Sequence, residues 1–264
     1  DWRLVPPSAG YLDAGRGIGL IDFLRGGGRA DGPLAAHVLE IMTGLLASAE
    51  ELEAAIQELV QRRRAGKLGN DVLSLLIRAH DAEGGVTDEQ LIGHIAVLFG
   101  AAHLTSAHTL TWTLFLLSQH PEVMQELHDE LQSVLGGETP RPDQLDQLPV
   151  LDRVLRESMR VLPASAYSQR MAAQPVDLGP FKLSPGSMVV FSQFITHHLP
   201  SLYEQPERFL PDRWKTIAPS AYEYLPFGAG PRMCIGAALG MMQLKISLPN
   251  ILNRFKLSVA PHSE

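Results

Sequence analysis

Cys234 is the only cysteine of this 264-residue chain, and it stands in the stretch FGAGPRMCIG, ahead of an apolar segment rich in helix-forming residues. A sulfur at the start of a helix meets unpaired backbone N–H groups and the positive end of the helix dipole, which favour the thiolate. Gly230 and Gly236 carry no side chains, so a flat, bulky group can approach the backbone. Arg232 offers a fork of donors to a carboxylate, and Phe227 can shield the sulfur. A thiolate beside a flat group that bears carboxylates describes a haem ligated by cysteine.

The alternative for a lone cysteine is the role of a small buried hydrophobic residue. Against that alternative, the stretch resembles the haem-binding loop of the cytochrome P-450 family, whose pattern is F-x-x-G-x-R-x-C-x-G. Every specified position matches, namely Phe227, Gly230, Arg232, Cys234 and Gly236. The resemblance implies that Cys234 is a catalytic residue and the axial ligand of the iron of haem b. It also implies that the other four residues contact the haem, with Arg232 paired to a propionate.

A second motif of the family, E-x-x-R, occurs as Glu157 and Arg160 in the stretch LRESMR. By itself this spacing would describe a surface pair worth about 0.2–0.5 kcal/mol. In the family the pair is buried and is completed by an arginine ahead of the haem loop. Arg208 and Arg213 both follow a proline and an acidic residue. The family pattern F-x-P-x-R-aromatic fits Arg213, so we predict that Arg213 completes the network and that Arg208 is a solvated loop residue.

The segment RVLPASAYSQRMA between these motifs resembles the family segment in which an arginine reaches a haem propionate. Arg170 is the candidate for this role. The alternative is that Arg170 is a surface arginine at the edge of a strand. One proline of the family pattern is missing, because Ala164 follows Pro163.

The stretch FGAAHLTSAHTLTW resembles the distal helix of the family, whose pattern is A/G-G-x-D/E-T-T/S. Thr105 and Ser106 match the last two positions, whereas Ala102 replaces the usual glycine and Leu104 replaces the usual acid. At about 100° per residue, Ala102 and Thr105 share one helix face and His103 points away from it. The resemblance implies that Thr105 is catalytic and that Ala102 lies against the haem.

The elements that must position these residues are mostly helices. The hydrophobic spacing, the capping box Thr87-Asp88-Glu89-Gln90 and Pro121 predict helix starts and ends. We expect helices over 40–65, Val72 to Ala79, Thr87 to about Ser118, Pro121 to about Leu135, Val150 to Leu162, and from near Cys234 to near Phe255. After Pro163, apolar segments alternate with Pro-Gly turns and predict short strands, and 200–226 is expected to be an irregular, proline-rich loop. Residues 1–33 are expected to form loops around Ile18 to Leu24.

The expected fold class is therefore mainly α, a truncated cytochrome P-450-like helical fold with small β-sheets. We expect one partial domain over 1–264, with its recognisable core at 34–264. Relative to the family the chain is expected to be incomplete at both ends, lacking sequence before the distal helix and a last hairpin after the final helix.

Composition excludes several classes of protein. The net charge of −7 and the pI of about 5.8 argue against a protein that coats nucleic acid or an anionic membrane. A single cysteine allows no intrachain disulfide, which fits a reducing compartment. Polar residues interrupt the apolar stretch 92–117, which is therefore predicted to be a buried helix of a soluble protein and not a membrane span. We expect a cytoplasmic protein with no membrane segment in this chain.

The resemblance implies a haem-thiolate monooxygenase, an oxidoreductase that inserts one oxygen atom from O2 into a small, apolar organic substrate. Electrons would come from a separate ferredoxin or flavoprotein. Cys234 would push electron density that favours O–O cleavage, and Thr105 would hydrogen-bond dioxygen and order a water for proton delivery. Two alternatives stay open: a haem-thiolate enzyme that uses peroxide or rearranges its substrate, and a non-catalytic remnant that binds no haem.

Overall fold

The computed structural model describes residues 33–83 and 87–257, which fall into two compact units. One unit comprises Asp1–Ala101 with Arg170–Ser187, and the other comprises Ala102–Gln169 with Met188–Glu264. The loops expected around Ile18 to Leu24 lie outside the described residues.

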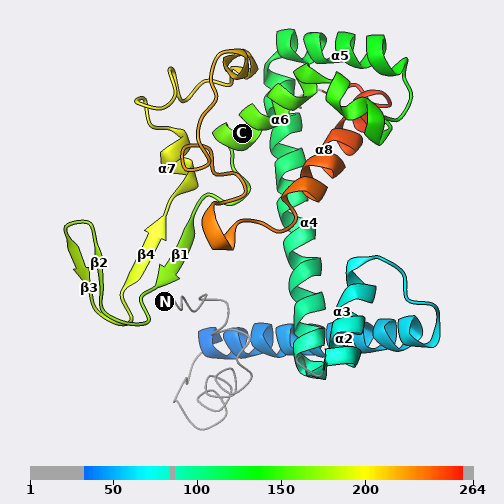
Figure 1. Cartoon of the computed structure of the whole chain (residues 1–264), viewed down its shortest axis with the longest axis vertical. Helices are drawn as coiled ribbons and strands as arrows, with labels where there is room; N and C mark the ends of the chain where they lie inside the picture. Colours follow the sequence, from blue (N-terminus) through cyan, green and yellow to red (C-terminus); the bar gives the residue numbers. More distant parts are fainter. Residues whose placement is uncertain (1–32, 84–86, 258–264) are drawn as a thin grey trace. The chain divides into compact units, whose positions relative to one another are not determined.

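Helices build the part of the first unit that precedes residue 102. They are α2 (Pro33–Ala65), α3 (Val72–Glu83) and the start of α4 (Asp88–Gln119). Apolar side chains of these three helices meet in a buried cluster of Ile56, Val60, Ile77 and Leu91. Figure 1 shows α3 beside the C-terminal part of α2.

The predicted capping box at the start of α4 is confirmed. The backbone N–H of Thr87 donates to Oε1 of Gln90 at 2.9 Å, and the backbone N–H of Gln90 donates to Oγ1 of Thr87 at 3.2 Å. Two backbone donors that the helix itself leaves unpaired are thereby satisfied.

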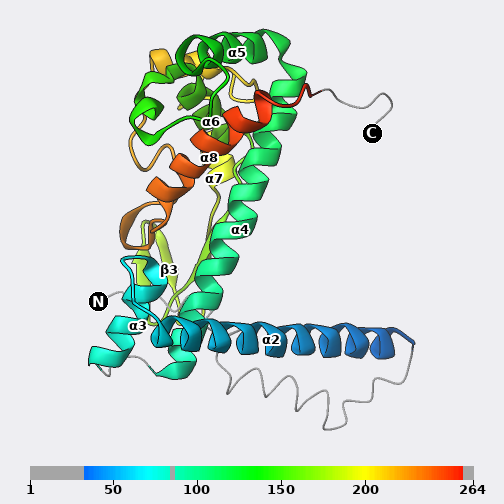
Figure 2. The same ribbon diagram turned by 90° about the vertical axis from the view of Figure 1, so that its right-hand side faces the viewer.

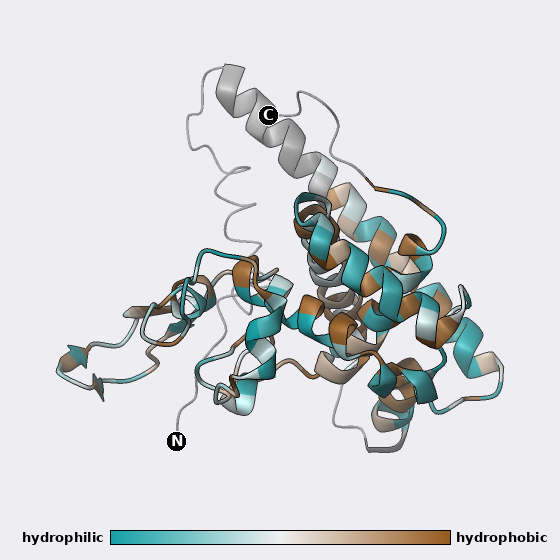
Figure 3. Cartoon of the chain, turned by 90° about the horizontal axis from the view of Figure 1, so that it is seen from above, coloured by the Kyte–Doolittle hydropathy of each residue, from teal (hydrophilic) through white to brown (hydrophobic). Residues whose placement is uncertain are grey.

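The second unit has the larger core. The rest of α4 lies together with α5 (Pro121–Leu135), α6 (Pro149–Val161) and α8 (Ala237–Leu252) (Figures 1 and 2). Figure 3 shows hydrophobic and hydrophilic residues mixed along the helical ribbons. Within this unit α5 and α6 are strongly amphipathic, as helices that cover a core require. Residues that are almost fully buried in this core include Leu117, Leu127, Leu131, Leu148, Leu151, Val154, Leu155 and Leu248.

The strands form two small sheets. Strand β1 (Ser168–Met171) pairs with β4 (Met188–Phe191), and β2 (Val176–Leu178) pairs antiparallel with β3 (Phe181–Leu183). The β2–β3 hairpin turns at Gly179, whose φ of 57° is readily adopted by glycine. The mainly α class with small β-sheets is confirmed.

The irregular segment between β4 and the cysteine contains short helices. It holds α7 (Gln193–His197) and the 3-10 turns Pro211–Lys215 and Gly230–Arg232. Helix α8 begins at Ala237, three residues after Cys234, and ends at Leu252. The helix predicted from near Cys234 to near Phe255 is thus shorter at both ends, and it begins later because the chain around Cys234 closes a loop.

Candidate haem-binding site

Glu157 on α6 is a buried carboxylate at the centre of a hydrogen-bond network. Its oxygens accept from Nε and Nη2 of Arg160, each at 2.9 Å, and Oε1 also accepts from Nε of Arg213 at 2.9 Å. The backbone N–H of Leu210 and the indole N–H of Trp214 donate to the same carboxylate at 2.9 and 3.0 Å. Glu157 and Arg160 are both fully buried. The donors fix the geometry of the carboxylate, while desolvation offsets much of the Coulomb attraction.

The structure confirms Arg213, and not Arg208, as the third member of this network. The side chain of Arg213 is only 7% exposed and pairs with Glu157. The exposed guanidinium of Arg208 donates instead to Oε1 of its neighbour Gln205 at 2.7 Å. Phe209, which is the first residue of the F-x-P-x-R-aromatic pattern when Arg213 is its arginine, is buried.

Arg160 extends the network to the main chain that leads toward the cysteine. Its Nη1 donates to the carbonyls of His197 and Pro206 at 2.8 and 2.7 Å, and its Nη2 donates to the carbonyl of Arg208 at 2.9 Å. One buried guanidinium thus satisfies three carbonyl groups of a segment that has little regular secondary structure. This explains how the proline-rich segment is ordered without a sheet or a long helix.

The chain enters the cysteine loop through Tyr224 and Leu225, and side-chain hydrogen bonds hold both. The hydroxyl of Tyr224 donates to the carbonyl of Arg156 at 2.9 Å, and the backbone N–H of Leu225 donates to Nε2 of His197 at 2.7 Å. Burial raises the pKa of Tyr224 well above its usual value, so the hydroxyl stays protonated and remains a donor. Neither His197 nor Tyr224 belongs to a motif that the sequence shares with the family, so the sequence did not predict either support.

The cysteine loop is closed on itself. The backbone N–H of Cys234 donates to the carbonyl of Phe227 at 2.8 Å, and that of Met233 donates to the carbonyl of Gly230 at 3.0 Å. Gly230 has a φ of 70°, a conformation that favours glycine. A Cβ atom added to Gly236 would lie 3.8 Å from Sγ of Cys234. The turn geometry therefore accounts for Gly230, whereas a side chain at Gly236 would make only an ordinary contact with the sulfur.

The surroundings of the sulfur fit a cysteine-ligated haem. Cys234 is exposed, and its neighbours Met233 and Ile235 are 59% and 94% exposed. Leu239, in the first turns of α8, is also 59% exposed. Large apolar side chains around an accessible thiol form a surface that a flat apolar group would cover. Arg232, two residues from the thiol, supplies the donors that a carboxylate on such a group needs.

The predicted distal residues lie in an exposed part of α4. Leu104 is 56% exposed, and Thr105 is exposed as well. The prediction that 92–117 is a buried helix is wrong over this part. The described residues supply packing partners near the two ends of the helix, where Leu91 and Leu116 enter the two cores, and leave its middle uncovered.

Helix α4 also meets a test of length and composition for a membrane span, with a mean hydropathy of 1.3 over its most apolar window. Core helices of soluble proteins meet the same test. This property of one helix is therefore weak evidence and assigns no membrane.

A row of threonines connects α4 to α6. Oγ1 of Thr109 donates to the carbonyl of Thr105 at 2.9 Å, and Oγ1 of Thr113 donates to the carbonyl of Thr109 at 2.8 Å. Oγ1 of Thr113 also lies 2.7 Å from Oγ of Ser158, and both of these side chains are buried. Ser158 is the neighbour of Glu157, so the row ends beside the buried network.

Five of the eight predicted site residues thus share the loop around Cys234. Ala102 and Thr105 lie on α4, one turn apart and both exposed. Arg170 is a partly buried residue of β1 and belongs to the first unit. The roles of these three residues toward a haem stay predictions.

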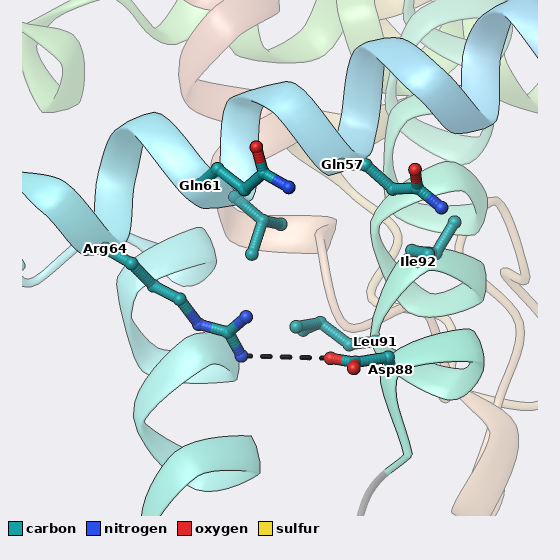
Figure 4. A pocket seen from close by; sticks show the side chains of 7 residues that line it. Gln57, Gln61, Arg64, Asp88, Leu91 and Ile92 are labelled. Carbon is teal, nitrogen blue, oxygen red and sulfur yellow. Dashed lines mark ion pairs between the residues drawn. The ribbon is translucent and has the colours of Figure 1, made fainter.

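A separate hollow lies between α2 and α4 in the first unit (Figure 4). The volume of the hollow is about 170 Å³. Nη2 of Arg64 lies 3.9 Å from Oδ1 of Asp88, and both residues line the hollow. None of the predicted site residues lines it. The lining residues are Gln57, Val60, Gln61, Arg64, Asp88, Leu91 and Ile92.

Comparison with known proteins gives the same assignment as the loop. The family model for cytochrome P450 matches residues 33–264. Pentalenene oxygenase of Streptomyces avermitilis is 32% identical over 218 residues, which cover 81% of this chain and 49% of the relative. Cyclooctatin synthase of Streptomyces melanosporofaciens is 34% identical over 217 residues, which cover 80% of this chain and 47% of the relative. Cytokinin hydroxylase of Arabidopsis thaliana is 31% identical over 221 residues, which cover 80% of this chain and 43% of the relative.

The chain spans about half the length of the curated relatives it matches. The match nevertheless includes the cysteine loop, the E-x-x-R helix and the arginine that completes the buried network. The match over residues 33–264 and the geometry of these elements agree, and the chain belongs to the cytochrome P450 family.

Proposed function

We propose that the protein is a haem-thiolate monooxygenase that inserts one oxygen atom from O2 into a small, apolar organic substrate. The observation that carries the proposal is the accessible thiol of Cys234 in a closed, glycine-bearing loop, surrounded by exposed apolar side chains. The names of relatives, which include an oxygenase, a monooxygenase and a hydroxylase, support the reaction class. The substrates in those names belong to the relatives.

In this proposal the cofactor is haem b. Cys234 would hold its iron through Sγ, and Arg232 and Arg170 would pair with its propionates. When bound, a cysteine-ligated haem supplies an iron centre that activates dioxygen, and the thiolate favours O–O cleavage. Gly230 and Phe227 would serve the close approach of the macrocycle and the shielding of the sulfur.

The residues of α4 would supply the distal side. The hydroxyl of Thr105 would orient one water and hold its proton within reach of the reacting oxygen. Ala102 would lie against the macrocycle, one turn away on the same face of the helix. Electrons would come from a separate ferredoxin or flavoprotein. We place the protein in the cytoplasm, as its single cysteine favours.

One other function has a specific observation in its favour. Leu104 replaces the usual distal acid, which favours an enzyme that uses peroxide or rearranges its substrate and has less need of a proton relay.

The absorbance of the ferrous protein under carbon monoxide tests the proposal. The 264-residue chain and its Cys234→Ser variant would be mixed with haem, purified, reduced and exposed to carbon monoxide. We expect a strongly red-shifted Soret band in the parent and none in the variant. Product formation with O2 and an electron donor, compared with product formation with peroxide, then separates the two enzymes. Absence of haem from the parent, or the same band in the variant, would contradict the haem-thiolate assignment.

A further inference from the structure

His197 joins the buried Glu157 network to the start of the cysteine loop. Its carbonyl accepts a hydrogen bond from Nη1 of Arg160 at 2.8 Å, and its ring Nε2 accepts one from the backbone N–H of Leu225 at 2.7 Å. Helix α6 carries Arg160 and packs against α7, which ends at His197 (Figure 1). One residue thus links the guanidinium of the network to the main chain that enters the loop.

The hydrogen bond from Leu225 fixes the protonation of the ring. Since Nε2 accepts, the ring must be neutral and must carry its proton on Nδ1. Burial, followed by the positive charge of Arg160, lowers the pKa of His197 to about 4, so the ring is neutral near pH 7. The titratable and charged groups around the ring are Arg160 and Glu157 of α6, the adjacent His198, and the rings of Tyr203 and Tyr224.

The other ring nitrogen argues that His197 is more than a space-filling residue. His197 is fully buried, and its Nδ1 has no hydrogen-bond partner. An unpaired buried donor costs about 1–3 kcal/mol. A leucine would fill a similar volume without that cost, but it could not accept from Leu225.

The position of Leu225 bears directly on the sulfur because the chain between them is short and closed. The backbone N–H of Gly228 donates to the carbonyl of Leu225 at 3.0 Å, and the backbone N–H of Cys234 donates to the carbonyl of Phe227 at 2.8 Å. A displacement of Leu225 therefore moves the turn on which the loop closes.

We propose that His197 is a positioning residue for Cys234. Its neutral ring holds the backbone N–H of Leu225, so that the cysteine loop closes with the sulfur of Cys234 exposed. The part of this role that concerns haem rests on the proposed function. The part that concerns the loop is a property of the chain itself.

Hydrogen exchange in the 264-residue chain without haem tests the role in the loop. The variants are His197→Leu, which has no acceptor, His197→Asn, which is polar but too short to reach, and His197→Gln, whose amide oxygen can take the place of Nε2. His198→Gln is the matched control, because the ring of His198 contacts the carbonyl of Phe194 and not the loop.

We expect the Leu and Asn variants to lose about tenfold protection at the amides of Leu225 and Cys234, which corresponds to a lost hydrogen bond of about 1.4 kcal/mol. The Gln variant and the control should stay close to the parent. The amide of Leu162, bonded within the core to the carbonyl of Ser158 at 2.8 Å, should be unchanged in all variants that fold. Unchanged protection at Cys234 in the Asn and Leu variants, or equal loss at all three amides, would overturn the proposal.

A second measurement separates this role from the proposed function. After loading with haem, the Asn and Leu variants should show a smaller fraction of the red-shifted carbon monoxide band than the Gln variant. If the parent itself gives no such band, the haem-thiolate function fails, and the exchange result alone decides whether His197 positions the loop.

Discussion

The Nε atom of Arg213 donates to Oε1 of Glu157 at 2.9 Å, although 56 positions separate the two residues in the chain. The carboxylate is fully buried and the guanidinium nearly so. This contact fastens the segment that precedes the cysteine loop to α6. Because both groups are desolvated, the pair mainly fixes geometry, and the loss of one partner leaves the other buried and unpaired.

We expect Arg213→Ala to lower the free energy of unfolding by about 3–5 kcal/mol, the usual cost of breaking a buried ion pair. Arg208→Ala is the matched control, because its exposed side chain contacts Gln205 and its backbone carbonyl is kept; it should change stability by less than about 0.5 kcal/mol. Urea unfolding followed by circular dichroism measures both. Equal losses in the two variants would contradict the network as described.

Local rules were enough to predict several elements from the sequence. Helix α5 has the predicted bounds, because Pro121 suits the first turn and Gly136, with a φ of 59°, ends the helix in a left-handed conformation. Arg213 was found because the spacing between an aromatic residue, a proline and the arginine is a fixed local pattern.

Contacts between distant segments could not be predicted in this way. The bond from Leu225 to His197 joins residues 28 positions apart, and nothing local to either residue indicates it. The burial of α4 was predicted wrongly for the same reason. An apolar helix pattern shows that a surface must be covered, but not which segment covers it.

Thr113 offers a test of the contact between α4 and α6. Thr113→Val keeps the shape of the side chain but removes the hydrogen bond to Ser158 and the one to the carbonyl of Thr109. Because the buried hydroxyl of Ser158 would then lose this partner, we expect a loss of about 1–3 kcal/mol in the free energy of unfolding. Thr111→Val, on an exposed position two residues earlier, should be close to neutral. A neutral Thr113→Val would show that this contact adds nothing to stability.

The pH dependence of stability should reveal His197. Its pKa is lowered from 6.5 to about 4 in the folded chain, so an unfolded chain takes up this proton first as the pH falls. The contribution of the neutral ring is fully present above pH 6.5 and is lost as the pH falls from 6.5 to about 4. The total loss is about 3–4 kcal/mol at about 1.4 kcal/mol per pKa unit.

Unfolding of the parent and of His197→Gln across this pH range measures that loss as a difference, because other titrating groups are common to both proteins. The stability of the variant should fall less steeply. Parallel curves would mean that the ring titrates alike in the folded and unfolded chains.

Leu104 should limit proton delivery if the proposed monooxygenase activity is correct. Splitting dioxygen consumes two protons, and the distal acid that the family pattern contains can pass them from solvent to the threonine. Leucine has no group that donates, accepts or holds a water, and Thr105 can orient a water but cannot replace its protons. We therefore expect the haem-loaded protein with its electron donor to release much of its reducing power as peroxide, or to work better with peroxide supplied.

Leu104→Asp and Leu104→Glu test this idea at little structural cost, because the side chain is 56% exposed. Product formed per reduced nicotinamide consumed should rise in at least one of these variants. Val97→Glu is the control, because it adds the same charge at a position on α4 that is 51% exposed and lies two turns earlier on the same face. Efficient coupling in the parent with an unreactive hydrocarbon, and no gain in either Leu104 variant, would show that protons reach the site by a route that does not pass position 104.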